Sequence, residues 1–258
     1  MFLGVEVREQ VVIGLAQSPV VKGDVTENLK THMAMIAQAS ELGCDIVAFP
    51  ELSLSGYELE LLNTLAVEPE AENFKGLSQA AMANNIIVIA GCPLSSKSSE
   101  KPAIGAVICF EDGEIEFYSK QFLHAGEENY CSTGTRDYVF NCKHHRIALA
   151  VCADFSAPEH SKNAAKAGAD VYLVSALISQ AGFEPDSKLF AQIAKTHHFP
   201  VLLSNHISVT GGWSSAGNNA VWDKTGQMLA CTNTKTPSLL RCSILERDIR
   251  AIKADIKL

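Results

Sequence analysis

One strand-to-helix stretch decides the fold: Arg146-Ile-Ala-Leu-Ala-Val-Cys-Ala-Asp-Phe-Ser-Ala-Pro-Glu159. The apolar, β-branched run 146–151 predicts a buried strand. A helical pattern over 158–167 follows, and Pro158 suits the first turn of a helix. The stretch therefore predicts the strand-turn-helix unit from which α/β folds are built.

Cys152 lies at the turn between this strand and this helix. Ser156 and Glu159 have the spacing of a capping box, so we expect Ser156 to cap the helix. The positive end of the helix dipole favours a thiolate close by. Buried cysteines usually act only as small hydrophobic residues, and this position makes Cys152 the leading candidate nucleophile among the eight cysteines.

The alternation of strand and helix patterns occurs twice along the chain. In each half, three strands separated by helices are followed by an antiparallel hairpin, and the run 239–245 is a candidate partner of the second hairpin. The repeat predicts one pseudo-symmetric α/β domain in which two layers face each other through their sheets. The predicted strands are 11–17, 45–49, 86–90, 146–151, 170–176 and 200–206, the helices 25–42, 70–84, 158–167 and 185–197, and the hairpins 103–119 and 219–231.

Composition excludes several classes of protein. Apolar residues make up 47% of the 258 residues, which excludes a disordered or fibrous chain. The 29 acidic residues outnumber the 21 Lys and Arg residues, and the net charge of -8 argues against nucleic acid or an anionic membrane as partner. We expect neither a signal peptide nor a membrane span. Because the cysteines form no CxxC pair, we expect a reducing, cytoplasmic location and no disulfide framework.

Motifs for cofactors and metals are absent from the sequence. Neither GxGxxG nor a Walker loop occurs, and no HExxH spacing is present. The segment Gly212-Trp-Ser-Ser-Ala-Gly217 departs from the GxSxG elbow of serine hydrolases. We therefore expect an activity without cofactor or metal.

Glu51 follows another predicted strand. In Asp45-Ile-Val-Ala-Phe-Pro-Glu51 it projects from the C-terminal end of the strand, where α/β proteins bind their ligands. Partial burial beside Phe49, Leu52 and Tyr57 would raise its pKa and suit a general base. A lone Glu at such a position is more often solvated, so the hypothesis requires a partner.

Lys120 ends the hairpin strand 114–119, in which an aromatic pair, Phe117 and Tyr118, comes before Ser119. A lone Lys at a strand end is ordinarily exposed. The following segment 121–130 is too long for a tight turn, and long loops of this kind often cover active sites. Lys120 is therefore a candidate only together with the two residues above.

The three segments together resemble the nitrilase superfamily of carbon-nitrogen hydrolases. Phe49-Pro-Glu51, Tyr118-Ser-Lys120 and Cys152-Ala-Asp154, followed by Pro158-Glu159, match the family motifs in order and rough spacing. The likeness covers residues 11–248, approximately. It implies a single carbon-nitrogen hydrolase domain over residues 1–258, an α-β-β-α sandwich of nitrilase type, and a homodimer or higher homo-oligomer.

The resemblance also implies catalytic roles. Cys152 would be the nucleophile, Glu51 the general base, and Lys120 the cation that stabilises the tetrahedral intermediate. Attack on an amide carbonyl requires these three kinds of group. Lys120→Met is expected to lose most of kcat with little change in folding.

Supporting residues follow from the same resemblance. The backbone N–H of Ala153 would be the second donor to the oxyanion. The second glutamate of the family stands three residues before an aromatic residue, which selects Glu127 ahead of Tyr130, with Glu128 as the alternative. This glutamate would position the substrate or Lys120.

Departures from the family pattern bear on the substrate. Ala153 stands where an aromatic residue is usual. Ser156 stands where members that bind acid-bearing substrates carry Arg, so bidentate capture of a substrate carboxylate is not expected; Lys188 would compensate only if its loop reached the pocket. We expect the loops 175–186 and 209–216 to shape that pocket. Its candidate residues are Tyr57, Asp154, Phe183 and Trp213.

Two classes of function stay open at this level. The first is an amidohydrolase that forms a thioester at Cys152 with a small, neutral or weakly charged amide and releases ammonia or an amine; attack of the same sulfur on a nitrile is the neighbouring alternative. The second is a noncatalytic binding or assembly module with a nitrilase fold. The expected partner is a small-molecule amide or nitrile, with neither nucleic acid nor membrane.

Overall fold

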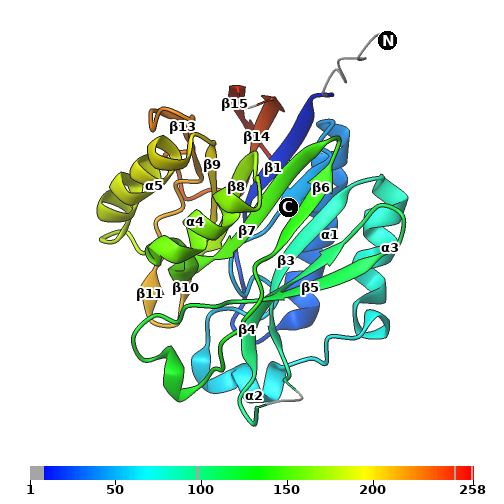
Figure 1. Ribbon diagram of the computed structural model, residues 1–258. Helices are drawn as coiled ribbons and strands as arrows, with labels where there is room; N and C mark the ends of the chain where they lie inside the picture. Colours follow the sequence, from blue (N-terminus) through cyan, green and yellow to red (C-terminus); the bar gives the residue numbers. More distant parts are fainter. Residues whose placement is uncertain (1–8, 97–98, 247, 257) are drawn as a thin grey trace, which may run out of the picture.

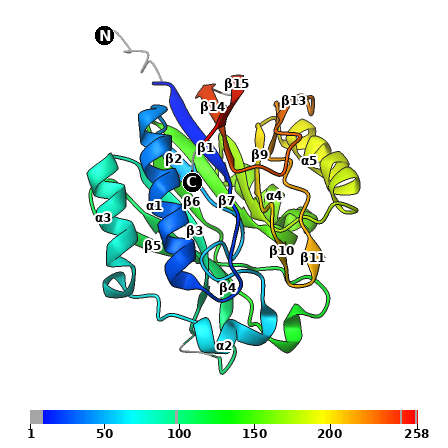
Figure 2. The same cartoon turned by 180° about the vertical axis from the view of Figure 1, so that it is seen from behind.

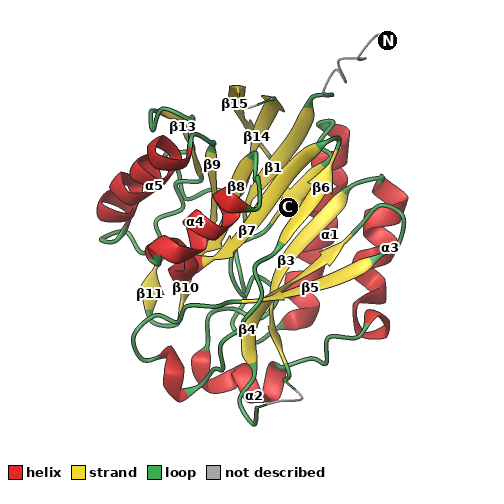
Figure 3. Ribbon diagram, viewed as in Figure 1, coloured by secondary structure: helices red, strands yellow, loops and turns green. Residues whose placement is uncertain are grey.

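Two β-sheets packed face to face form the centre of the molecule (Figure 1). The computed structural model describes residues 9–96, 99–246, 248–256 and 258; the segment 1–8, for which no signal peptide is expected, lies outside them. Helices α1 (Val25–Glu41) and α3 (Lys75–Asn84) cover one sheet, and α4 (Pro158–Lys166) and α5 (Phe183–His197) cover the other (Figure 2). Helices lie outside and strands inside (Figure 3), so the predicted α-β-β-α sandwich is confirmed.

The first sheet has seven strands. They are β1 (Val11–Gln17), β2 (Ile46–Ala48), β3 (Ile87–Leu94), β4 (Ala103–Cys109), β5 (Ile115–Ser119), β14 (Ser238–Leu245) and β15 (Asp248–Asp255). Their order is β15-β14-β1-β2-β3-β4-β5, with β1, β2 and β3 parallel and β3, β4 and β5 antiparallel.

The second sheet repeats this arrangement with six strands. They are β6 (Val139–Cys142), β7 (His145–Val151), β8 (Val171–Ala176), β9 (Val201–Asn205), β12 (Ala220–Trp222) and β13 (Met228–Cys231). Their order is β13-β12-β9-β8-β7-β6, with β7, β8 and β9 parallel. A separate small hairpin joins β10 (Val209–Thr210) and β11 (Trp213–Ser214). The short helices are η1 (Leu59–Leu61), α2 (Leu62–Leu65), η2 (Ala71–Phe74), η3 (Glu127–Asn129) and η4 (Cys152–Ser156).

Successive side chains of each strand point to opposite faces of its sheet, and this gives the protein three apolar layers. In β7, Ile147 and Leu149 face the other sheet, whereas Ala148 and Ala150 face α4 and α5. In β1, Ile13 likewise faces the space between the sheets. Strands buried on both faces read as continuous apolar runs, and this explains why the sequence located them so well.

Some predicted boundaries and pairings were wrong. The run 239–245 belongs to β14, which pairs with β1 and β15 in the first sheet and not with the hairpin β12–β13 of the second. The helix predicted over 70–84 is η2 followed by α3. The helix α4 has Ala157 as its N-cap, without a side-chain cap, so the capping box of Ser156 and Glu159 does not form, although Pro158 is its first residue.

The sequence analysis missed the edge strands β6 and β15. The strand β15 alternates weakly, and most of its side chains are partly or fully exposed. Among the residues that the structure describes, no helix is both long enough and apolar enough to cross a bilayer.

Candidate active site

Glu51 lies in a tight turn after β2 that is docked against β3. The N–H of Leu54 donates to the Gly91 carbonyl at 2.9 Å, and the N–H of Gly91 donates to Ser53 Oγ at 3.1 Å. A Cβ atom at Gly91 would lie 2.3 Å from the backbone nitrogen of Leu52, so only glycine permits this close approach. The turn buries the Glu51 side chain completely.

Lys120 follows β5 and is likewise buried completely. Its Nζ lies 2.8 Å from Glu51 Oε1 and 2.8 Å from Glu127 Oε1. Backbone hydrogen bonds to Ile104 and from Gly134 hold the residue on both sides. A Lys without solvent is stable only when it is paired, so its two carboxylate partners explain its burial.

Glu127, in the first turn of η3, is the glutamate that the structure places beside Lys120. Its Oε1 also accepts a hydrogen bond from the Tyr57 hydroxyl, and its Oε2 accepts one from the N–H of His124 at 2.7 Å. Glu128 is exposed; its carboxylate accepts a hydrogen bond from the N–H of Gly126, and its carbonyl accepts one from Lys101 Nζ. Of the two predicted alternatives, Glu127 is therefore the one that contacts Lys120.

Cys152 is the first residue of η4 and directly follows β7. Its φ of 45° lies in the left-handed region, which is unfavourable for a residue with a Cβ. This sharp turn directs the sulfur out of the strand, and Sγ contacts the Leu177 carbonyl at 3.8 Å. Backbone strain of this kind is concentrated at functional sites.

Asp154 holds the Cys152 turn in place. Its Oδ2 accepts hydrogen bonds from the N–H of Val151 at 2.9 Å and from the Tyr118 hydroxyl at 2.7 Å. Its Oδ1 accepts from the N–H groups of Gln121 and Phe122, both at 2.9 Å. The side chain is fully buried and ties the turn after β7 to the segment after β5. Contrary to the prediction, Asp154 does not line the cavity beside Cys152.

The charges of this cluster are strongly coupled. Burial raises the pKa of Glu51, although Lys120 opposes the shift. Burial opposes the charge of Lys120, but the attraction of Glu51, Cys152 and Glu127 raises its pKa overall. Burial and the neighbouring Glu51 raise the pKa of Cys152 well above its ordinary value. Burial first, and the negative charge of Glu51 second, therefore disfavour the thiolate that the helix dipole was expected to favour.

Comparison with known proteins identifies the family. Residues 12–254 match the sequence profile of the carbon-nitrogen hydrolases. The chain belongs to the carbon-nitrogen hydrolase family. The superfamily that the motifs resemble is thus confirmed, and the protein is an enzyme of the amidase and nitrilase type.

Named relatives of this carbon-nitrogen hydrolase include both kinds of enzyme. A probable nitrilase of Schizosaccharomyces pombe is 22% identical over 240 residues, which are 89% of this chain and 87% of that protein. An (R)-stereoselective amidase of Pseudomonas sp. is 25% identical over 209 residues, which are 80% of this chain and 75% of that protein. A mutant amidase from Nesterenkonia sp. AN1, with acrylamide added at its active site cysteine, has a TM-score of 0.79 and 25% identity and covers 90% of this chain and 92% of that one.

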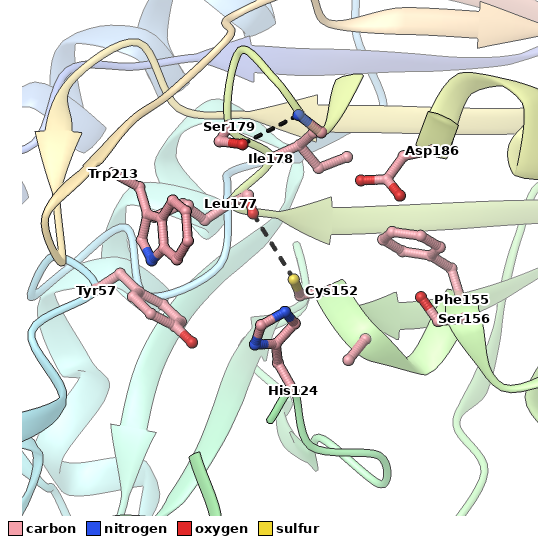
Figure 4. A pocket seen from close by; sticks show the side chains of 12 residues that line it. Tyr57, His124, Cys152, Phe155, Ser156, Leu177, Ile178, Ser179, Asp186 and Trp213 are labelled. Carbon is pink, nitrogen blue, oxygen red and sulfur yellow. Dashed lines mark hydrogen bonds between the residues drawn. The ribbon is translucent and has the colours of Figure 1, made fainter. Parts of the chain in front are cut away.

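A cavity of about 320 Å³ opens beside Cys152 in this carbon-nitrogen hydrolase (Figure 4). Of the candidate pocket residues, Tyr57 and Trp213 line this cavity and Phe183 does not. Lys188 also lies elsewhere, paired with Glu184 at 2.8 Å on the surface of α5. The cavity is lined by Tyr57, His124, Cys152, Ala153, Phe155, Ser156, Leu177, Ile178, Ser179, Gly182, Asp186 and Trp213.

Several lining residues were missed by the sequence analysis. His124, Phe155, Ser179 and Asp186 belong to no motif. The sequence analysis did predict that two loops, 175–186 and 209–216, shape the pocket, and both loops supply part of the cavity wall. Within the described ranges, no group of three or more His, Cys, Asp or Glu side chains is arranged to hold a metal ion.

Proposed function

We propose that this enzyme hydrolyses the C–N bond of small-molecule amides through a thioester at Cys152. The observation that supports it best is the buried Lys120 ammonium, 2.8 Å from both Glu51 and Glu127, close to a cysteine that lines a cavity. A base, a cation and a nucleophile then share one enclosed site. This is the set of groups that acyl transfer requires.

In the acylation step, Glu51 takes the thiol proton as the sulfur attacks the amide carbon. Glu51 Oε2 has no partner of standard hydrogen-bond geometry in the described part of the chain, which leaves it available for this proton. Because the pKa of Cys152 is raised, transfer and attack occur together and no free thiolate accumulates. Lys120 Nζ and the N–H of Ala153 stabilise the oxyanion.

Collapse of the tetrahedral intermediate breaks the C–N bond. The leaving nitrogen takes the proton from Glu51 and departs as ammonia or an amine. In deacylation, Glu51 removes a proton from water, the hydroxide oxygen attacks the thioester, and the carboxylic acid leaves while the sulfur of Cys152 recovers its proton. Glu51 thus returns to its ionised form in each half-reaction.

Nitrile hydrolysis is the second candidate, because the relatives include a probable nitrilase. The same sulfur would add to the nitrile carbon and give a thioimidate. Ammonia release from a panel of primary amides and from the matching nitriles decides between the two. We expect the amides to be the better substrates.

Substitution of Cys152 tests the proposal. Cys152→Ala and Cys152→Ser should abolish ammonia release and leave the melting temperature close to that of the wild type, since the thiol is a weak donor in its hydrogen bonds to the Leu177 carbonyl and to Glu51. Ammonia release by Cys152→Ala at the wild-type rate would refute the thioester mechanism.

Alkylation separates an enzyme from a noncatalytic binding module. Cys152 and Cys231 are the two partly exposed cysteines, so Cys231 is an internal control. With iodoacetamide at neutral pH, we expect mass spectrometry to find Cys152 labelled faster than Cys231. Glu51→Gln should slow labelling at Cys152 alone. Equal rates at both cysteines would support the binding module.

The predicted homo-oligomer and the cytoplasmic location stay predictions. We propose a homodimer on the family resemblance. Sedimentation equilibrium measures the mass directly and would show a monomer if this proposal is wrong.

A further inference from the structure

Asp186 brings a carboxylate to the wall of the cavity that contains Cys152. It lies in the first turn of α5, and its carboxylate is directed towards the space beside Ile178 and Phe155 (Figure 4). No described residue makes a hydrogen bond or an ion pair of standard geometry with this carboxylate. Apart from burial, the electrostatic effect on the pKa of this carboxyl group comes from His124, which lowers it and also lines the cavity.

The environment of Asp186 is unfavourable for a charge that has no partner. The residue is half-buried, and this burial raises the pKa of its carboxyl group. Desolvation of a carboxylate without a compensating donor reduces the stability of the folded protein. Unpaired titratable groups in a cavity are candidates for ligand binding for this reason.

Glu184 is the other acidic residue at the start of this helix and serves as a comparison for Asp186. Both residues are in the first turn of α5, where the helix dipole favours a negative charge. Glu184 points into solvent, with 82% of its side chain exposed, and pairs with Lys188. Asp186 instead faces the cavity, so the helix dipole alone does not explain its position.

The remaining wall of the cavity suits a cation. Among the described residues, neither Lys nor Arg lines it, and Asp186 is the one acidic residue of the lining. The aromatic side chains of Tyr57, Phe155 and Trp213 also line it. Aromatic faces attract ammonium groups, and a negative wall repels a substrate carboxylate.

We propose that Asp186 binds a protonated amine of the substrate, so that the preferred substrates are amides that carry an ammonium group away from the reacting carbonyl. This inference rests on the proposed amide hydrolysis and names its substrate class. The reacting end of the substrate meets Cys152, and the charged end meets Asp186 in the same cavity. Specificity then comes from a charge-assisted hydrogen bond that a neutral amide of the same length lacks.

Matched substrates test the proposal. Primary amides with three to six carbons between the carbonyl and a terminal amine are compared with amides that end in a methyl group and with amides that end in a carboxylate. For wild-type enzyme, we expect kcat/KM for the best ammonium amide to exceed that of its methyl analogue by about 10- to 100-fold, the range for one hydrogen bond to a charged group. Amides that end in a carboxylate should be the poorest substrates.

Two variants assign the effect to one side chain. Asp186→Asn should reduce the ratio of the two kcat/KM values by about 10- to 100-fold, mainly through KM of the ammonium amide. Glu184→Gln removes a charge from the same helix turn outside the cavity and should leave the ratio unchanged. An unaltered ratio in Asp186→Asn, or an equal loss in both variants, would overturn the proposal.

The outcome for neutral amides keeps the two proposals separate. If methyl-ended amides are hydrolysed without any preference for ammonium amides, amide hydrolysis stands and the role of Asp186 is refuted. If no amide is hydrolysed, calorimetric titration of the Cys152→Ala protein decides the second question. Tighter binding of the ammonium amide than of its methyl analogue, lost in the Cys152→Ala/Asp186→Asn protein, supports the cation site, and equal binding refutes it.

Discussion

The Ser175 hydroxyl donates a hydrogen bond to the Phe49 carbonyl at 2.7 Å, and this bond crosses from one sheet to the other. Ser175 lies on β8 in register with Val151, the residue before Cys152. Phe49 lies two residues before Glu51. The bond therefore links β8, which pairs with the strand that presents the sulfur, to the turn that presents the carboxylate.

Ser175→Ala should lower kcat by about 10-fold with little effect on KM, because the base is displaced from the sulfur while the cavity wall is retained. The buried Phe49 carbonyl would lose its partner, which destabilises the fold by about 1–3 kcal/mol. Steady-state kinetics and urea unfolding measure the two effects. Ser204→Ala is the matched control, since Ser204 also crosses between the sheets but binds carbonyls within β1 and β2. An equal loss of kcat in both variants would contradict the positioning role.

Glu127→Gln should lower kcat by about 10- to 100-fold, because it removes one of the two negative charges that hold Lys120. Glu128→Gln, one residue along, changes an exposed side chain and should leave kcat as it is. Ammonia release at saturating substrate measures both. The reverse result would transfer the supporting role to Glu128.

The three candidate catalytic residues were predicted from strand ends. Glu51, Lys120 and Cys152 each follow a strand; Lys120 Nζ lies 2.8 Å from Glu51 Oε1, and Cys152 is near enough to influence the pKa of both groups. Their proximity was predictable because strand ends are visible as the limits of apolar runs. The degree of burial was not visible: a Lys after a strand is ordinarily exposed, and only the two carboxylates from distant segments explain why Lys120 is not.

The sequence patterns did not predict which further side chains line the cavity. His124 lies in the segment 121–130, which carries no motif, and Asp186 lies at the start of a predicted helix whose pattern does not show that this residue faces the cavity. Asp154 was predicted to line the pocket, yet its four hydrogen bonds point into the protein. Side-chain direction in a turn depends on φ and ψ, which sequence spacing does not determine.

The pH dependence of kcat/KM should reflect the ionisation of the Glu51 carboxyl group. Its pKa is raised by burial above the ordinary value of 4.5, and the base must be ionised to take the thiol proton. We expect kcat/KM for a neutral amide to fall as the pH is lowered through a pKa above 4.5. The pKa of Lys120 is raised from 10.5, so Lys120 causes no loss of rate between pH 7 and 9. An acid limb below pH 4.5 would argue against Glu51 as the base.

Lys120→Met should lower kcat by about 10²- to 10³-fold or more, because it removes an oxyanion donor. The structure revises the expectation that folding is little changed. Two buried carboxylates would lose their shared cation, and breaking such a pair destabilises by about 3–5 kcal/mol. In urea unfolding, Lys120→Met/Glu127→Gln should be more stable than Lys120→Met, since one unpaired charge is gone. Equal stability of the two variants would show that the carboxylates do not depend on Lys120.

Stability should decrease in acid because two histidines are buried in neutral form. Burial lowers the pKa of His32 and of His206 from 6.5 to about 4. His206 Nε2 donates to the Glu51 carbonyl at 2.6 Å, and His32 bonds Asn28 and Ser53 through its two ring nitrogens. Neither ring has an acidic partner in these bonds that would stabilise a second proton.

Between pH 6.5 and 4 the unfolded chain binds a proton at each of these histidines and the folded protein does not. The contribution of the two histidines to the free energy of unfolding is therefore complete above pH 6.5 and is lost as the pH approaches 4, by roughly 3 kcal/mol for each histidine at the lower limit. Urea unfolding at several pH values measures the slope for the wild type and for His206→Gln. The difference between the two curves isolates His206, because the other titrating groups are common to both proteins. Parallel curves would mean that His206 accepts its proton in the folded state at its ordinary pKa.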